Sequence, residues 1–469
     1  MLTIKGPSQR LCEGLSRRDF LHVGAIGGIT LALPALRSAS AASPKSGAAS
    51  FGRAKRCVLL FLTGGPPQLD TWDPKPQAPD QIRGEFKPIA TNIPGIRVCE
   101  LLPRLARQAD KYCIVRSVTH GDNTHTSAGY TMLTGAYHPQ ANAPTAKDIR
   151  PSPDDHPHVG SVLAKFRPSR GGVPTFAALP EIIKDAGVNI FPGQDGGFLG
   201  NRFGPFAIQG DPRSGSFQIP NIALPPDVTA ERLVDRRLLA ARLDQALHMM
   251  DRQPARSDLD VFRDQAVALI RTPTVRQAFE LGREPERLRD VYGKHLFGQG
   301  CLLARRLLEG EVSLVTVYWH YEGPDDSPVW DTHENNFQHL KQRLAPPADQ
   351  AFASLLEDLS TRGLLSDTLV VCMGEFGRSP RVNSKGGREH WASVQSVVLA
   401  GAGIQGGSVY GSSDRIAAYP GDNPVTPPEL TATILHLLGV QPDLEVQDRL
   451  GRPLRLCEGK PIHSLLTSL

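Results

Sequence analysis

The feature that most constrains the fold is an unbroken apolar run at residues 57–62, CVLLFL. A run without polar alternation is typical of a strand buried on both faces, as in the parallel sheets of α/β proteins. It stops at the TGGPP sequence of residues 63–67, where the glycines permit a tight turn and the prolines end the strand. Asp70 and Asp73 follow the carboxyl end of this strand, which is where open α/β sheets hold their sites. From this stretch alone, a ligand site and a capping or turn role for the two carboxylates both stay open.

The same alternation of strands and helices returns in the second half of the chain. Apolar runs predict strands at 312–317, 368–373 and 394–399, and an earlier one at 112–117. Helical spacing predicts helices over 101–109 and 348–359, and a capping box at Thr426 and Glu429 opens a third through Leu438. This order of elements favours an α/β protein built on a mostly parallel sheet.

Four separate segments place acidic or basic side chains just after predicted strands. Because the carboxyl ends of parallel strands meet at one edge of a sheet, these segments are expected to converge. The resulting mixture of oxygen and nitrogen donors suits zinc, manganese or iron rather than an all-oxygen calcium site. The competing interpretation is a set of unrelated caps and turns. The candidate metal ligands are Asp70, Asp331, His333, Glu375 and His390.

A polar turn at residues 120–127, HGDNTHTS, leads into a helix-like segment at 128–133. A helix N-terminus presents free backbone N–H groups and the positive end of the helix dipole, so it stabilises an anion or an ionised hydroxyl. The turn therefore supplies His125, Thr124 and Thr126 as candidate catalytic groups. An imidazole at His125 can ligate a metal, take a proton or attack directly. The structural alternative, an ordinary cap by Thr or Ser, is compatible with these roles.

The charge of the chain argues against a nucleic-acid partner. The 469 residues carry a net charge of +4, and five basic against two acidic residues at positions 1–42 leave the remainder at +1. Aromatic residues are only 6% of the sequence, and nothing forms the basic stripe with interleaved aromatics that nucleic-acid binding needs. An anionic substrate must therefore be held by a local site.

The N-terminus has the layout of an export signal. Arg17 and Arg18 lie in the sequence SRRDFL, a weakly apolar segment runs to Leu36, and small residues end it near Ala41. This pattern resembles a twin-arginine signal peptide, which predicts a leader over 1–42, a linker over 43–55 and a periplasmic or cell-envelope location. An amphipathic N-terminal helix is the alternative. No second apolar run approaches 18 residues, so no transmembrane segment is expected in the mature chain.

The remaining segments are expected to be structural or to line the site. Residues 136–226 are rich in Pro, Gly and Asn and predict long loops of the kind that wall a site. The DDHPH sequence at 154–158 precedes a helix-like segment, which favours helix capping over metal binding. A charged helical pattern over about 228–309 predicts a helical insertion at the edge of the domain. Six cysteines follow the leader without a C-x-x-C pair, so a zinc–thiolate site is not expected, although one disulfide stays open.

The motifs resemble the alkaline phosphatase and sulfatase superfamily, and more closely a large family of exported, sulfatase-like bacterial proteins without an assigned function. They are LTGGPPQLDTWDPKP, HTSAGYTMLTG, PGQDGGFLG, WDTHENNF, LLSDTLVVCMGEFGRSPRVN, GREHW and the final GRPLRL. The resemblance implies an alkaline-phosphatase-like three-layer α/β sandwich, a mostly parallel central sheet with helices on both faces, over residues 56–469. It also implies that Asp70, Asp331, His333, Glu375 and His390 bind divalent metal, with the nucleophile in the turn at 124–127.

Two departures separate the chain from the superfamily pattern. His125 and Gly129 stand where sulfatases carry the Cys or Ser and the Arg of C/S-x-P-x-R, so formylglycine chemistry is not supported. Glu375 and Phe376 replace the Asp-His pair after the strand at 368–373, which removes one imidazole. Arg378 adds a cation that is expected to hold a sulfate or phosphate oxygen.

The resemblance leaves two functions from different classes. The first is a metal-dependent hydrolase of a phosphate or sulfate ester, acting on a small-molecule or polysaccharide ester. The second is a non-catalytic binding protein for a polysaccharide or an envelope partner, because sites are grafted on folds and can decay on them.

Overall fold

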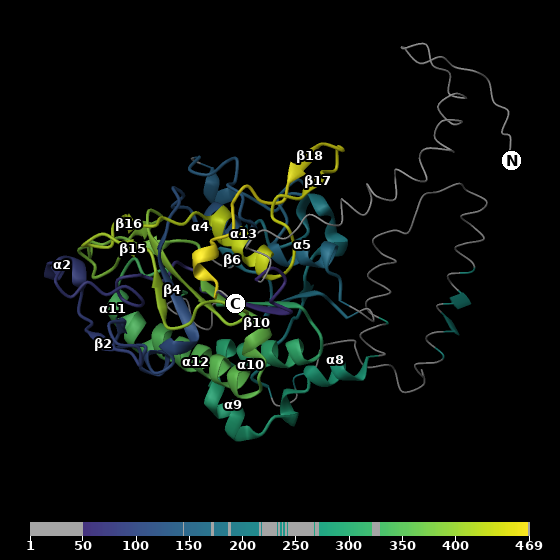
Figure 1. The fold of residues 1–469 in the computed structure, drawn as a ribbon, viewed down its shortest axis with the longest axis horizontal. Helices are drawn as coiled ribbons and strands as arrows, with labels where there is room; N and C mark the ends of the chain where they lie inside the picture. The colour runs from purple at the N-terminus through teal and green to yellow at the C-terminus, as the bar shows by residue number, and fades with distance from the viewer. Residues whose placement is uncertain are drawn as a thin grey trace, which may run out of the picture. The chain divides into compact units, whose positions relative to one another are not determined.

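A computed structural model describes residues 50–143, 145–169, 173–185, 189–214, 217, 272–320 and 329–467, with a few isolated positions between 232 and 267 (Figure 1). The predicted leader, most of the predicted linker and, apart from a few isolated positions, the part of the predicted helical insertion before residue 272 lie outside the described residues. No helix among the described residues is long and apolar enough to cross a membrane.

An eight-stranded sheet forms the centre of the described part, in the order β14-β4-β13-β10-β1-β9-β5-β8. Strand β1, Arg56–Phe61, lies in the interior of this sheet and pairs in parallel with β9 and β10. Only β13 runs against its two neighbours, β10 and β4. The expected mostly parallel sheet is therefore confirmed. The other strands are β4 (Tyr112–Val118), β5 (Phe176–Leu179), β8 (Phe206–Ala207), β9 (Leu314–Tyr318), β10 (Thr368–Met373), β13 (Gln395–Ala400) and β14 (Ser408–Tyr410).

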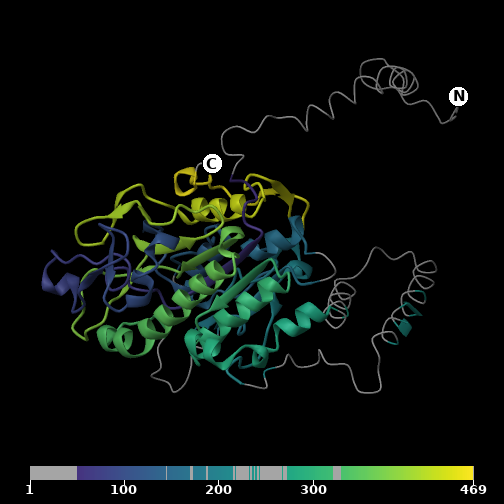
Figure 2. The same cartoon turned by 60° about the horizontal axis from the view of Figure 1, so that its bottom comes forward.

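Helices cover both faces of the sheet, because the strands are apolar on both sides. Val58 and Leu60 of β1 pack in one core with α10, Leu296–Glu309, and α12, Ala345–Thr361. The alternate residues, among them Leu59, pack in a second core on the opposite face. That second core contains α5, Val159–Phe166, and α13, Pro427–Leu437. Figure 2 shows the green helices on one side of the sheet and the yellow helix on the other, so the three-layer α/β sandwich is confirmed.

Short elements complete the described part. Five two-stranded ribbons pair β2 with β3, β6 with β7, β11 with β12, β15 with β16 and β17 with β18. Their bounds are Pro88–Ala90, Arg97–Cys99, Lys184–Asp185, Asn189–Ile190, Gly377–Arg378, His390–Trp391, Ser412–Ser413, Pro420–Asp422, Glu445–Gln447 and Pro453–Arg455. The remaining α-helices are α2 (Asp80–Arg83), α3 (Pro103–Ala106), α4 (His125–Thr134), α8 (Pro273–Ala278), α9 (Glu286–Tyr292) and α11 (Asn336–His339).

The helix predictions are most accurate where the sequence contains a recognisable capping residue. Thr426 and Glu429 form the expected capping box at the start of α13. His158 caps α5, its side chain accepting a hydrogen bond from the Gly160 N–H, so the DDHPH sequence caps a helix as favoured. The predicted helix over 101–109 shortens to the single turn of α3. Helix α10, at the end of the predicted insertion, belongs to the layer that covers the sheet.

The six cysteines of the described part are all buried and unpaired, so none of them forms the disulfide that the sequence left open. Cys57 and Cys113 lie in strands of the central sheet, and burial raises the pKa of both thiols above the ordinary value. A buried thiol held in its neutral form is a small apolar side chain and a poor metal ligand.

Candidate metal centre

Side chains from three separate segments meet beyond the carboxyl ends of β9 and β10. Asp331 and His333 lie on the chain that follows β9, and His390 lies on β12. His125 is the first residue of α4, which follows β4. In the β11–β12 ribbon, His390 is paired directly with Arg378, so these two side chains are brought to the same place. Of the residues expected to converge, Asp331, His333 and His390 meet here.

Three imidazole nitrogens converge on one carboxylate oxygen. Asp331 Oδ1 lies 3.1 Å from His333 Nε2, 3.1 Å from His390 Nε2 and 3.3 Å from His125 Nε2. The Nε2 atoms of His333 and His390 are 2.8 Å apart. In the part of the chain that the structure describes, His125, Asp331 and His390 form the group whose ligand atoms all lie within 4.8 Å of one another.

The other ring nitrogen of each histidine is held by an acceptor. His125 Nδ1 lies 2.6 Å from Glu375 Oε1, and His333 Nδ1 lies 2.6 Å from Glu389 Oε2. His390 Nδ1 lies 2.7 Å from the backbone oxygen of Asn123. An acceptor at Nδ1 places the ring proton on that nitrogen, which leaves the Nε2 lone pair free to ligate.

This donor set fits a divalent transition metal. Three Nε2 lone pairs and a carboxylate oxygen repel one another unless a cation or extra protons lie between them. Metal bonds of about 2.0–2.2 Å put neighbouring ligand atoms of a tetrahedral site roughly 3.3 Å apart. The distances of 3.1, 3.1 and 3.3 Å to Asp331 Oδ1 are close to that value. His125 Nε2 is also buried without a hydrogen-bond partner, as expected of an atom whose partner is a metal.

Without a metal, protons on the histidines supply the positive charge that balances the carboxylates. Burial opposes protonation of His125, but the adjacent carboxylates of Asp331 and Glu375 outweigh burial and raise its pKa to about 9. A hydrogen bond to Asp331 also raises the pKa of His333, whereas burial lowers the pKa of His390. Burial acts to raise the pKa of Asp331, but the surrounding imidazoles hold it well below its usual range. Metal binding would therefore displace protons from this cluster.

Glu375 lies outside the ring of ligand atoms, unlike the sequence-based expectation. Its Oε1 accepts hydrogen bonds from His125 Nδ1 and from the Gly64 N–H, at 2.6 and 2.8 Å. The side chain is fully buried, and Oε2 has no partner. Glu375 therefore orients a histidine, and His125 stands in the ligand position. The Phe376 ring lies 4.9 Å from the His125 ring and 4.5 Å from the His390 ring, which fixes both imidazoles from one side.

Asp70 is not brought into the cluster. Both of its oxygens are held by the guanidinium of Arg388, and Asn336 Nδ2 donates to Oδ2 at 2.9 Å. Its carboxylate already has an internal cation, so the expected metal-ligand role is replaced by an ion pair.

Arg378 is also placed differently from the expectation. Its side chain has no exposed surface, and NH2 donates to Asp331 Oδ1. The Nε and NH1 nitrogens donate to the backbone oxygens of Gly65 and Arg388, each at 3.0 Å. Because every nitrogen is bonded inside the protein, Arg378 balances the charge of Asp331 and does not reach a substrate oxygen.

The two threonines of the turn differ. Thr126 is fully buried, and its hydroxyl donates to the backbone oxygen of Ala146 at 2.6 Å, so it points away from the cluster. Thr124 is the N-cap residue of α4 and makes no side-chain capping bond. It is half-buried, so its hydroxyl is the one that stays available beside His125.

Sequence reasoning missed the residues that hold the ligands. Arg388 and Glu389 precede His390 within the GREHW motif, so the motif itself was the signal. The backbone oxygen of Asn123 and the N–H of Gly64 left no signal, because any residue type supplies those atoms.

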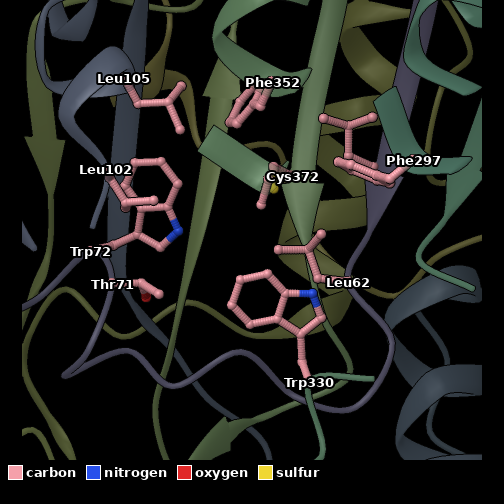
Figure 3. A pocket seen from close by; sticks show the side chains of 11 residues that line it. Leu62, Thr71, Trp72, Leu102, Leu105, Phe297, Trp330, Phe352 and Cys372 are labelled. Carbon is pink, nitrogen blue, oxygen red and sulfur yellow. The ribbon is translucent and has the colours of Figure 1, made fainter. Parts of the chain in front are cut away.

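Two hollows of the described part of the chain have walls that do not include the residues of the cluster. Figure 3 shows an apolar cavity of about 20 Å³ between Trp72 and Trp330, with Leu62 and Phe352 among its walls. It holds no more than about one water and is a gap in the packing under the sheet. A polar cleft of about 340 Å³ lies where β5 and β9 end. Its walls include Pro180, Glu181, Gln209, Asp211, Leu296 and His320.

These features define a three-layer α/β protein with a histidine–carboxylate centre at the carboxyl edge of its sheet. Residues 54–466 match the family described as "Protein of unknown function (DUF1501)", and the chain belongs to that family. No curated protein matches the sequence.

Several solved structures match this chain at low similarity. Ps i-CgsB in complex with k-i-k-neocarrahexaose is 12% identical, with a TM-score of 0.40 over 83% of this chain and 72% of that chain. A protein in the alkaline phosphatase superfamily from Vibrio parahaemolyticus is 12% identical, with a TM-score of 0.36 over 83% and 67%. A putative sulfatase from Bacteroides thetaiotaomicron VPI-5482 is 10% identical, with a TM-score of 0.38 over 88% and 74%. At these scores no activity is carried over to this chain.

Proposed function

We propose that this protein is a metal-dependent hydrolase of phosphate or sulfate esters. The observation that carries the proposal is the orientation of three histidines, each with Nδ1 on an acceptor and Nε2 directed at Asp331 Oδ1. A purely structural histidine needs no such arrangement, whereas metal-binding histidines commonly donate the second ring N–H to an acceptor.

His125, Asp331 and His390 would hold the metal, and His333 completes the set. Zinc, manganese and iron fit this mixture of imidazole and carboxylate. When bound, such a metal acts as a Lewis acid that stabilises negative charge developing on an ester oxygen.

The chain itself contributes orientation and charge. Glu375 and Glu389 fix the rings of His125 and His333, and the N-terminus of α4 adds the positive end of a helix dipole at His125. Thr124 is the hydroxyl candidate for attack or for substrate binding, since Thr126 is turned away. The polar cleft at the ends of β5 and β9 has the volume of a small-ligand site, about 340 Å³, and is the proposed place for the rest of a small-molecule or polysaccharide ester.

The second candidate is a binding protein without catalysis, for a polysaccharide or an envelope partner. One observation favours it. Arg378, the cation that was expected to hold the anionic ester group, is fully buried and bonded at every nitrogen. The metal would then be structural.

Metal content and activity separate the two candidates. Purified protein without residues 1–42 should contain about one equivalent of divalent metal and hydrolyse at least one of p-nitrophenyl phosphate, bis-p-nitrophenyl phosphate and p-nitrophenyl sulfate. Dialysis against a chelator should abolish hydrolysis, and adding back the metal should restore it. His390→Ala should lose metal and activity, whereas His463→Ala, an exposed histidine outside the cluster, should keep both.

The outcomes point to different conclusions. Bound metal without hydrolysis of any of the three esters supports the binding protein. Elemental analysis that finds no metal in folded protein, even after incubation with zinc, manganese or iron, contradicts the metal centre itself.

A further inference from the structure

Asp70 and Arg388 form a fully buried ion pair. Arg388 lies two residues before His390 in the sequence. Arg388 donates from Nε to Asp70 Oδ2 at 2.7 Å and from NH2 to Oδ1 at 3.0 Å. Neither side chain has any exposed surface. The two residues are 318 positions apart in the sequence, so the pair joins the exit of β1 to the segment that carries His390.

The same pair is connected to the segment that carries Asp331 and His333. The Arg388 N–H donates to the backbone oxygen of Thr332 at 3.0 Å. The Thr332 hydroxyl donates to Asn336 Oδ1 at 2.6 Å, and Asn336 Nδ2 donates to Asp70 Oδ2 at 2.9 Å. Thr332 lies between Asp331 and His333, so this closed set of bonds fixes the backbone between two residues of the cluster.

The energetics of a buried ion pair point to geometry rather than to stability. Removing two charges from water offsets most of their attraction, and an apolar pair of the same shape often stabilises a fold equally well. A bidentate guanidinium–carboxylate contact instead fixes distance and angle between the two chain segments that it joins. Here those segments carry the residues of the metal centre.

We propose that Asp70 is a positioning residue. With Arg388 it holds segments 331–333 and 388–390 at the spacing that brings His333 Nε2 and His390 Nε2 onto Asp331 Oδ1. Asp70 acts through Arg388 and touches no ligand atom. The inference rests on the proposed metal centre and assigns to Asp70 a role that differs from the ligand role expected from the sequence.

Cobalt binding tests the proposal without relying on activity. Co²⁺ is titrated into metal-free protein, and the affinity and the visible absorption spectrum of the complex are measured. Asp70→Asn keeps the shape of the side chain but removes its charge. It should weaken Co²⁺ binding about 10–100-fold, the usual cost of losing a group that orients metal ligands, and should alter the spectrum. Arg388→Lys keeps the charge but loses the two-pronged contact, and it should act in the same direction.

A matched control comes from a second buried ion pair. Asp358 contacts Arg305 Nε at 2.9 Å between α12 and α10, with side-chain exposures of 11% and 1%. Asp358→Asn should lower thermal stability but leave Co²⁺ affinity within about threefold of the unmodified protein, since it holds no part of the centre. A general loss of stability is thereby separated from a loss of positioning.

Each result has a definite meaning. If folded Asp70→Asn and Arg388→Lys bind Co²⁺ with unchanged affinity and spectrum, the positioning role is wrong while the metal centre stands. If the unmodified protein binds no Co²⁺, the metal centre fails and this role fails with it. Should neither variant fold, Asn336→Ala leaves the ion pair in place and removes the bonds that join Asp70 to Thr332 through Asn336. Weaker Co²⁺ binding by Asn336→Ala supports the role, and unchanged binding overturns it.

Discussion

At the scale of single residues, the two nitrogens of each imidazole in the cluster make different contacts. Nδ1 of His125, His333 and His390 each meets an acceptor within 2.6–2.7 Å, so those nitrogens show which atoms orient the rings. The Nε2 atoms meet at Asp331 Oδ1, which is the position of the proposed metal site. The two sets of contacts together distinguish a ligand from a histidine that is merely buried.

His125 is the residue for which ligation and catalysis make different predictions. His125→Ala should lower any hydrolysis rate by at least about 10²-fold, which both roles predict. If His125 is a ligand, the variant should also bind metal more weakly, and added imidazole should restore both metal binding and rate. Competition against a chromogenic chelator measures the affinity. Full metal affinity with a lost rate would instead assign His125 to proton transfer or attack.

Thr126→Val is the neighbouring control. The hydroxyl of Thr126 is bonded to a backbone oxygen inside the protein, so its loss should cost some stability and leave the rate within a few-fold. A rate loss as large as that of His125→Ala would contradict this and indicate that Thr126 acts in catalysis.

Sequence reasoning located the segments of the centre better than it assigned their side chains. Asp331, His333 and His390 meet as expected, because the carboxyl ends of parallel strands share an edge. Glu375 was expected to be a ligand but contacts His125 Nδ1 instead, while ligation was one of the roles left open for His125. Side-chain packing decides which of two neighbouring polar groups faces a shared point. The partner of Asp70 was not predictable, because Arg388 is 318 positions away and any carboxylate at a strand end fits either a metal or a guanidinium.

At the scale of elements, the exit of β1 determines where Asp331 lies. Gly64 has a φ of +112°, and its N–H donates to Glu375 Oε1 at 2.8 Å. A Cβ added at this position would lie 2.4 Å from the Asp331 nitrogen and 2.5 Å from the Trp330 nitrogen. The chain that carries Asp331 therefore passes directly over the glycine turn. The apolar run and the TGGPP sequence predicted the strand and its end, but not which segment would cross it.

Gly64→Ala tests this close approach. The added methyl group clashes with backbone and forces a disfavoured φ, so the variant should lose at least about 3 kcal/mol of unfolding free energy. It should also bind metal more weakly, because the clash displaces Asp331. Urea denaturation measures the stability, and chelator competition measures the affinity.

Gly363→Ala is the matched control for backbone strain alone. Gly363 has a φ of +70° at the end of α12, and nothing lies within 4 Å of an added Cβ. Its replacement by alanine should lower the unfolding free energy by only about 1–2 kcal/mol, which is typical of a residue with a side chain in the left-handed conformation. Equal losses for the two variants would contradict the crowding at Gly64.

At the scale of the whole molecule, the proposed centre joins parts of the chain that are distant in sequence. His125 is more than 200 positions from Asp331, and Asp331 is 59 positions from His390, so the three come together only when the sheet has formed. A metal that binds the folded chain alone stabilises it, by about 2.7 kcal/mol at one hundred times its dissociation constant. Metal binding and folding are therefore coupled, so the metal is expected to bind in the compartment in which the chain folds.

The order of folding and export gives the last prediction. A twin-arginine signal over residues 1–42 would carry a chain that is already folded, so the metal would be loaded in the cytoplasm before transport. Replacing both Arg17 and Arg18 by lysine should leave uncleaved precursor in the cytoplasm, because the paired arginines are the feature that the transport route reads. Cell fractionation and immunoblotting measure the distribution. Arg10→Lys changes a basic residue outside the SRRDFL sequence and should leave export intact. Unchanged export of the double variant, with cleavage near Ala41, would assign the leader to a different route and remove the reason for loading in the cytoplasm.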